Sequence, residues 1–166
     1  MKIKVVSDTH FGHEKLLELR GFSSVDEMNE AIIDKWNKLV DKDDRVIHLG
    51  DFAVGMKEDD IEKIISRLNG KITLILGNHD TFSKLKNVYI KYFKCLSSLY
   101  APPYYFTHEP INEECLKEQI TRIPTINIHG HLHSPKYLGD CFMNMNYDVV
   151  GLDNMVKEFE VEKLGG

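Results

Sequence analysis

The chain has 166 residues, a length typical of one domain, and we expect a single domain over residues 1–166. Its hydrophobic content of 42%, charged content of 28% and formal net charge of −5 are ordinary for a globular protein and argue against binding to duplex nucleic acid or to an anionic membrane. Three scattered cysteines without a Cys-x-x-Cys motif argue against a thiolate zinc site, and the lack of a long apolar run predicts a cytoplasmic protein without a membrane span.

The first half of the chain alternates strand-like and helix-like segments. Short apolar and β-branched runs predict three strands, at Ile3–Val6, Arg45–Leu49 and Ile72–Leu76. Polar residues or glycine end each run, and a helix-length segment separates each strand from the next. This order predicts parallel strands joined by helical crossovers, which is an α/β architecture.

Two helices are predicted between these strands. Val25–Val40 carries apolar residues at helical spacing, and Ser24 followed by Glu27 is typical of a capping box. In the second helix, which we expect Asp59 or Asp60 to cap, apolar residues again recur on one face. We expect both helices to pack these apolar faces against the sheet.

After residue 87 strands dominate the pattern. The strand-like segments are Val88–Phe93, Cys95–Tyr100, Tyr104–Thr107, Thr125–His129, Cys141–Asp148 and, at the C-terminal end, Met155–Leu164. Only Asn112–Gln119 favours a helix, and its apolar spacing is weak. We therefore expect a second sheet that packs on the first.

Metal-seeking side chains follow five of the predicted strands, each time at the strand end. These stretches hold five of the eight histidines and are Asp8-Thr9-His10, Gly50-Asp51, Gly77-Asn78-His79-Asp80, His108 and Gly130-His131-Leu132-His133. Open α/β sheets bind their ligands beyond the carboxyl ends of the strands. The sequence therefore predicts that the five stretches meet in one site.

The side chains of these stretches suit divalent cations. Asp8 with His10, and His131 with His133, are each two residues apart, so both members of a pair point the same way on extended backbone. The Asp51 carboxylate has two oxygens and a full charge, so it can lie between two cations. Mixed oxygen and nitrogen donors favour Mn, Fe, Zn, Ni or Co over Ca or Mg. A set of this size predicts two metal ions, an arrangement typical of phosphate-ester hydrolysis.

In this order the motifs resemble those of the calcineurin-like metallophosphoesterase superfamily. Its pattern is D-x-H, G-D, G-N-H-[DE], H and G-H-x-H, and every block is present between Asp8 and His133. Ser7–His13, Trp36-Asn37 and Leu49–Phe52 are similar to the small single-domain bacterial and phage members. The resemblance implies a four-layer α/β/β/α sandwich with two mixed sheets and a metal site at the carboxyl ends of the strands.

The resemblance also implies a role for each motif residue. The ligands would form two triads joined by Asp51, one of Asp8, His10 and His133 and the other of Asn78, His108 and His131. His79 would be the catalytic histidine, and Asp80 would orient its ring through a hydrogen bond. The cofactors would be two divalent ions, manganese before the others. A hydroxide that both ions share would attack a phosphate ester.

Two residues outside the motifs are candidates for substrate binding. His13 lies three residues beyond His10 and is expected at the start of a helix, where an anionic phosphate is favoured. Arg20 would add positive charge to the site that binds the substrate phosphate. His48 and His129 lie inside predicted strands, and we expect them to be buried and hydrogen-bonded rather than to bind metal.

The spacing of the motifs leaves the substrate open between a phosphomonoester and a phosphodiester, including nucleotides and cyclic nucleotides. No cap domain is evident in so short a chain, and an open site favours the diester. The alternatives to a phosphoesterase are a metal-binding scaffold that docks partners and a single structural zinc site.

Overall fold

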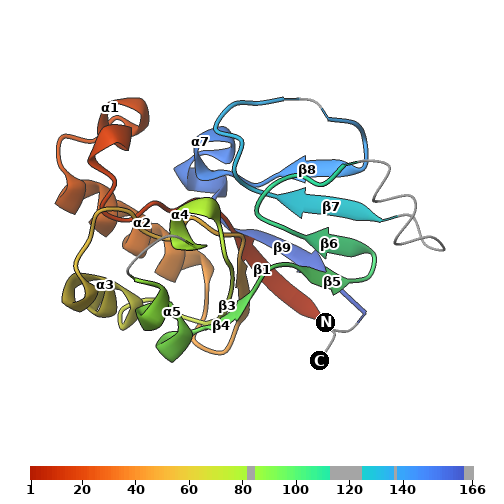
Figure 1. Cartoon of the computed structure of the whole chain (residues 1–166), viewed down its shortest axis with the longest axis horizontal. Helices are drawn as coiled ribbons and strands as arrows, with labels where there is room; N and C mark the ends of the chain where they lie inside the picture. Colours follow the sequence, from red (N-terminus) through yellow and green to blue (C-terminus); the bar gives the residue numbers. More distant parts are fainter. Residues whose placement is uncertain (82–84, 113–124, 137, 163–166) are drawn as a thin grey trace.

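Two β-sheets lie face to face in the computed structural model, which describes residues 1–81, 85–112, 125–136 and 138–162 (Figure 1). Helices cover the outer face of the first sheet, and the second sheet packs on its inner face. The prediction of a mixed α/β fold with two mixed sheets is therefore confirmed. Of the helix predicted at Asn112–Gln119, only the first residue lies within the described ranges.

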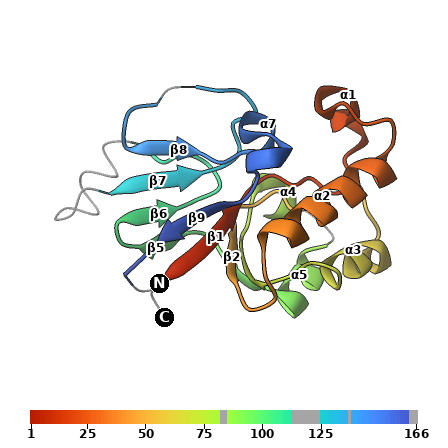
Figure 2. The ribbon, with the colours of Figure 1, turned by 180° about the vertical axis from the view of Figure 1, so that it is seen from behind.

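The first sheet contains the parallel strands that the sequence predicts. Its order is β4-β3-β2-β1-β9, in which β9 alone runs antiparallel, and the strands are β1 (Lys2–Val6), β2 (Arg45–His48), β3 (Lys71–Ile75), β4 (Lys94–Leu96) and β9 (Lys157–Glu160). The helices between the parallel strands are α2 (Val25–Leu39), α3 (Glu58–Ile65) and α5 (Lys86–Tyr92). Figure 2 shows them on the side away from the second sheet. The predicted helical crossovers are confirmed.

The second sheet has the order β5-β6-β7-β8. Its strands are β5 (Leu99–Ala101), β6 (Tyr104–Phe106), β7 (Ile126–His129) and β8 (Phe142–Asn144), of which β5 pairs antiparallel with β6 and the others are parallel. The short helices α7 (Tyr147–Val150) and η2 (Leu152–Asn154) then lead the chain back to β9 in the first sheet.

Alternate residues of the first sheet enter two separate cores. Val6, Val46 and Leu74 face the helices and pack in a cluster with Trp36 of α2. Their neighbours Val5, Ile47 and Ile75 face the second sheet and pack in another cluster, which includes Phe106 and Ile128. Because both faces of the sheet are covered, neighbouring residues such as Val5 and Val6 of β1, and Leu74 and Ile75 of β3, are all buried.

The prediction of a strand at Val88–Phe93 is wrong, because most of this segment lies in the helix α5 instead. Leu85, Val88 and Tyr89 are buried at helical spacing, whereas Ile90 is 58% exposed. The ring of Tyr89 lies edge-on to that of Phe52, with centroids 5.7 Å apart. The helix lets this apolar face cover the sheet, which an alternating strand would not do.

Two other predicted strands are shorter than expected. Cys95–Tyr100 divides into β4 and β5, which belong to different sheets, so the chain crosses between the sheets at Ser97 and Ser98. Cys141–Asp148 keeps only the three residues of β8 before the chain turns into α7.

The predicted N-cap is confirmed for the first of the two helices and not for the second. Ser24 caps α2 as predicted, and its side chain accepts a hydrogen bond from the Glu27 backbone N–H at 3.1 Å. The capping prediction for α3 is wrong, because Lys57 occupies its N-cap and both Asp59 and Asp60 lie in its first turn. Carboxylates in the first turn still favour the helix through its dipole.

No helix within the described ranges combines the length and the apolar character needed to cross a membrane.

Candidate metal centre

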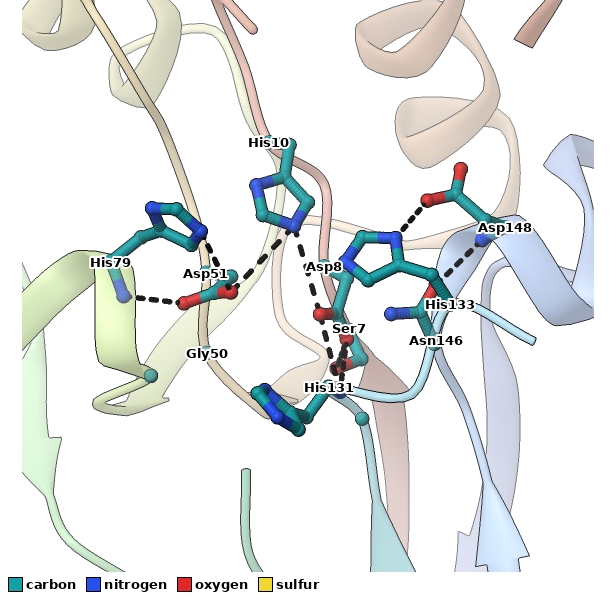
Figure 3. A network of polar contacts seen from close by, with 12 residues as sticks. Ser7, Asp8, His10, Gly50, Asp51, His79, His131, His133, Asn146 and Asp148 are labelled. Atoms are coloured by element: carbon teal, nitrogen blue, oxygen red, sulfur yellow. Dashed lines mark hydrogen bonds and ion pairs between the residues drawn. The ribbon is translucent and has the colours of Figure 1, made fainter. Parts of the chain in front are cut away.

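The predicted site residues come together where strands of both sheets end. Asp8 follows β1, Asp51 follows β2 and Asn78 begins the short helix α4 (Asn78–Thr81) after β3. From the second sheet, His108 follows β6 and His131 follows β7. Residues 123 positions apart along the chain are in contact here, since the His131 N–H donates to both carboxylate oxygens of Asp8. Figure 3 shows the side chains of Asp8, Asp51 and His131 converging.

One group of possible metal ligands contains Asp8, His10 and His133, whose donor atoms all lie within 4.8 Å of one another. His10 Nε2 lies 3.8 Å from Asp8 Oδ1 and 3.7 Å from Asp51 Oδ2. The His10 ring is fully buried, and within the described residues neither of its nitrogens has a hydrogen-bond partner. A buried polar atom without a partner costs about 1–3 kcal/mol, and a cation at Nε2 would remove that cost.

A second group contains Asp51, His108 and His131, so it lies beside the first through Asp51. The amide oxygen of Asn78 is 2.9 Å from His108 Nε2 and 3.1 Å from His131 Nδ1. Asp51 Oδ2 is 3.5 Å from His108 Nε2 and 3.7 Å from His10 Nε2. One carboxylate oxygen is thus placed close to both groups.

The proton positions of the second group favour a cation. His108 Nδ1 lies 2.8 Å from the Leu49 carbonyl oxygen, which can only accept, so Nδ1 carries the proton and Nε2 of the neutral ring presents a lone pair. This lone pair faces the Asn78 amide oxygen and the Asp51 carboxylate. Electron-rich atoms that face one another repel unless a proton or cation lies between them. The donor set therefore fits a divalent ion.

Four of the proposed ligands have left-handed backbone conformation. Within the described part of the chain, the non-glycine residues with positive φ are Asp8 (53°), His10 (48°), Asp51 (55°) and His131 (63°). Such conformations cost on the order of 1–3 kcal/mol each and gather at functional sites, where the surrounding structure enforces them. The chain therefore turns sharply where β1, β2 and β7 end, at Asp8, Asp51 and His131.

Burial controls the protonation of the first group. Burial raises the pKa of Asp8 to about 7, although the Ser7 hydroxyl hydrogen bond and the His131 N–H partly oppose it. Burial also lowers the pKa of His10, with the nearby Arg20 charge next in effect. Burial thus disfavours the charged form of both side chains, Asp8 and His10. A bound cation would favour the ionised carboxylate and the neutral imidazole.

His79 lies on the solvent side of this centre. Its backbone N–H donates to Asp51 Oδ1 at 2.9 Å, and its ring Nε2 is 4.0 Å from Asp51 Oδ2. The side chain is 43% exposed, whereas that of Asp51 is 2% exposed. His79 also belongs to a third possible ligand group, with His10 and Asp51. The ring therefore contacts the centre and remains accessible to a substrate.

The hydrogen bonds of Asp80 differ from the prediction that it orients the His79 ring. Its carboxylate accepts from the backbone N–H groups of Asp51 at 2.6 Å, Phe52 at 3.0 Å and Gly77 at 3.0 Å. Asp80 is fully buried, and burial raises its pKa to about 6. Asp80 thus holds the loop of Asp51 against the end of β3.

Arg20, which the sequence predicts to bind substrate, has its guanidinium buried and hydrogen-bonded within the protein in this structure. It donates to the backbone carbonyls of Thr9 at 2.7 Å and Asp8 at 2.9 Å, and to the Asp148 carboxylate at 2.7 Å. It also stacks over Tyr147, with Cζ 4.0 Å from the ring centroid. The side chain is 2% exposed, so its contacts are with the protein itself.

His13 lies beside the centre, as a substrate-binding residue would. Its ring centroid is 5.2 Å from that of His10 and 6.0 Å from that of His79. Burial and the neighbouring His79 lower its pKa. The helix that follows it, η1 (Glu14–Leu16), is a short 3-10 turn, so the expected support from a helix dipole is small.

The family of the chain follows from comparison with known proteins. A model of the calcineurin-like phosphoesterase superfamily domain matches residues 1–145. The chain belongs to the calcineurin-like phosphoesterase superfamily. This superfamily comprises phosphoesterases that use divalent metal ions, and the two ligand groups around Asp51 agree with that chemistry. The substrate class that the family implies is a phosphate ester.

Relatives of this calcineurin-like chain cover nearly its whole length. An uncharacterized protein of Methanocaldococcus jannaschii is 31% identical over 98% of this chain and 94% of its own. The gene 66 protein of Mycobacterium phage L5 is 32% identical over 80% of this chain and 77% of its own. The crystal structure of a protein of unknown function from Aquifex aeolicus shares the fold, with a TM-score of 0.67, 22% identity and coverage of 89% and 90%.

One residue of the centre escapes sequence reasoning. Asp148 accepts from His133 and Arg20, which are 15 and 128 positions away along the chain. No local motif marks it. It is the last residue of the predicted strand Cys141–Asp148 and lies beyond the family match, which ends at residue 145. Only the folded chain places it at the calcineurin-like site.

We predict that Gly77→Ala removes metal binding. A Cβ on Gly77 would collide with the Asp51 carboxylate and would lie 2.5 Å from its backbone nitrogen, which cannot move aside. A misplacement of about 1 Å at a reactive site can cost about 100-fold in rate. Gly55→Ala is the control, since the nearest atom to a Cβ there is 3.9 Å away and only the left-handed backbone (φ 74°) opposes the substitution, far from Asp51. Calorimetric metal titration of both variants tests this, and normal binding by Gly77→Ala contradicts it.

His48 is buried and hydrogen-bonded, as predicted, and gives a pH dependence. Its Nδ1 accepts from the Gly50 N–H at 3.1 Å and its Nε2 donates to Thr9 Oγ1 at 3.0 Å, so both nitrogens of the neutral ring are used. Burial lowers its pKa to about 3. The unfolded chain takes up a proton near pH 6.5 and the folded chain does not, so this contribution to stability is lost as the pH falls below 6.5.

We therefore expect the metal-free protein to lose about 2 kcal/mol more unfolding free energy between pH 7 and pH 5 than His48→Gln does. Denaturant unfolding of both proteins at the two pH values measures the difference. An identical pH dependence would contradict a neutral His48 in the folded state.

Proposed function

We propose that this chain is a dinuclear metal-dependent phosphoesterase that prefers phosphodiesters. The observation that carries the proposal is the convergence of electron-rich atoms on Asp51 Oδ2, which lies 3.7 Å from His10 Nε2 and 3.5 Å from His108 Nε2. A single structural zinc site needs about four ligands, and this centre has two groups that meet at one carboxylate.

The proposed ligands divide as follows. One ion binds Asp8, His10 and His133, the other binds Asn78, His108 and His131, and Asp51 contacts both. When bound, divalent cations lower the pKa of water towards neutrality and offset negative charge on phosphate oxygens. The neutral tautomer of His108, fixed by Leu49, keeps its free nitrogen directed into the centre.

His79 is the proposed catalytic residue. Its backbone N–H holds Asp51, while its exposed ring can reach a substrate oxygen above the centre. A histidine in this place can donate a proton to the leaving oxygen, a contribution of about 10²–10⁴ in rate. Asp80 is a positioning residue, because it holds the backbone of Asp51.

An open site supports the preference for a diester. The side chains of His79 and His133 are 43% and 39% exposed. A cavity of about 370 Å³ lies beside the second ligand group, lined by Leu76, Gly77, Asn78, Ser97, Thr107, His108 and Glu109. This volume can receive the second substituent of a phosphodiester, which a phosphomonoester lacks. Nucleotides and cyclic nucleotides are among the substrates that fit this description.

The test is a matrix of metals and substrates on the purified protein. Metal-free protein is supplied with Mn, Fe(II), Co, Ni or Zn and assayed with bis(p-nitrophenyl) phosphate and p-nitrophenyl phosphate, while elemental analysis gives the number of metals per chain. We expect two metals per chain, manganese-supported turnover and a higher kcat/KM for the diester. A higher value for the monoester would indicate a phosphatase. Metal binding without turnover of either ester would indicate a scaffold.

A further inference from the structure

We propose that Asp148 is a positioning residue that fixes the ring of His133 and thereby sets the metal affinity of the first ligand group. The inference rests on the proposed function, because it takes His133 as a metal ligand. Asp148 comes from α7, near the C-terminal end of the described chain, so it gives this segment a role in the metal centre.

The geometry gives His133 a defined orientation. Its Nδ1 lies 2.5 Å from Asp148 Oδ2, and a carboxylate can only accept, so Nδ1 carries the proton. In the neutral ring the other nitrogen then has a free lone pair, and Figure 3 shows it on the side of the ring that faces Asp8 and His10. A metal-ligating histidine commonly donates its second nitrogen to a carboxylate, which fixes its tautomer and makes it a better ligand.

Asp148 is itself rigidly held. Its side chain is 2% exposed, and its Oδ1 accepts from Arg20 Nε at 2.7 Å. Its backbone N–H donates to the side-chain oxygen of Asn146 at 2.8 Å, and Asn146 is the N-cap of α7. The His133 side chain is 39% exposed, and its ring is held by the Asp148 hydrogen bond and by contact with the His10 ring, whose centroid is 5.2 Å away.

Arg20 extends the support to a second ligand of the same ion. The guanidinium that binds Asp148 also donates to the backbone carbonyls of Asp8 and Thr9. One buried ion pair therefore fixes the backbone that carries Asp8 and the ring of His133 at the same time. Because the pair touches neither Asn78 nor His108, its loss should affect one ligand group and leave the other intact.

The experiment measures metal affinity rather than turnover. Manganese is titrated into metal-free wild type, Asp148→Asn and the control Asp153→Asn, which removes the same charge from an exposed residue five positions along. We expect the affinity of one site in Asp148→Asn to fall by about 10–100-fold, and that of the other site to stay within about threefold of wild type. Asp153→Asn should match wild type at both sites. Two unchanged sites in Asp148→Asn would overturn the proposal.

A double-mutant cycle separates positioning from general support of the fold. If Asp148 acts through His133, then Asp148→Asn should cause no further loss of metal affinity in a His133→Gln background. An equal loss in both backgrounds would show that Asp148 acts elsewhere and would overturn the proposal.

A measurement on wild type needs no variant and distinguishes failure of the proposed role of Asp148 from failure of the proposed function. Nitrogen NMR of the histidine rings, with zinc as a diamagnetic ion, should show His133 protonated at Nδ1 and shifted by metal at Nε2. Coordination through Nδ1 would overturn the role of Asp148 alone. Failure of wild type to bind any metal would instead refute the proposed function.

Discussion

His79→Asn is expected to retain both metal ions and to lose at least about 100-fold in kcat. The expectation follows from the position of the ring, which is 43% exposed and lies 4.0 Å from Asp51 Oδ2. A general acid contributes about 10²–10⁴ in rate, and asparagine cannot transfer a proton at neutral pH. The backbone N–H that holds Asp51 is unchanged by the substitution. Elemental analysis and steady-state kinetics on the same sample provide the two measurements.

The leaving group provides a sharper version of this test. If His79 protonates the leaving oxygen, the loss should be larger for an alkyl ester than for a p-nitrophenyl ester, whose leaving group needs no proton. His79 also falls within a possible ligand group with His10 and Asp51. Loss of one metal in His79→Asn would therefore assign it as a ligand, and full activity would remove it from the mechanism.

Asp51→Asn is expected to weaken both metal sites. Asp51 Oδ2 is within 4 Å of His10 and His108, which belong to different ligand groups. Removing its charge also weakens the electrostatic attraction of the centre for two divalent cations. Replacing an outer partner of a ligand costs about 10–100-fold in affinity, so loss of a shared ligand should cost more than about 100-fold at each site.

Calorimetric titration and elemental analysis measure this effect. Asp43→Asn is a matched control, since Asp43 precedes β2, the strand that Asp51 follows. Its side chain is 97% exposed and pairs only loosely with Lys71 at 3.5 Å. The control should bind two metals with the affinity of wild type. Two tightly bound metals in Asp51→Asn would refute the bridging role, and loss of one metal would place Asp51 in a single site.

Local patterns predicted β1, β2 and β3 of the first sheet, because each contains a short run of mostly apolar and β-branched residues that polar residues or glycine end. The errors occurred where an apolar run is compatible with two structures. Val88–Phe93 reads as a strand by composition, yet Leu85, Val88 and Tyr89 are buried on one face of a helix. Short apolar runs do not distinguish a strand from a buried helix, and the choice depends on which surface is left for them to cover.

The roles of charged side chains depended still more on the fold. Arg20 was expected at the substrate because a positive charge suits a phosphate, and the fold instead buries it against Asp8, Thr9 and Asp148. Asp80 was expected beside the His79 ring, and three backbone N–H groups take its carboxylate. Short polar motifs specify the kind of residue at a position and leave its partner open.

The sequence alone determined that metal-binding residue types stand at the ends of five strands, in the order typical of one family, because those residues are contiguous with the strands that carry them. Tertiary structure decided which of them meet, since Asp8 and His131 come from different sheets and are 123 positions apart. It also decided the left-handed turns that aim Asp8, His10, Asp51 and His131 inward, and the contact of Asp148 with His133. These features depend on long-range packing, which no local pattern encodes.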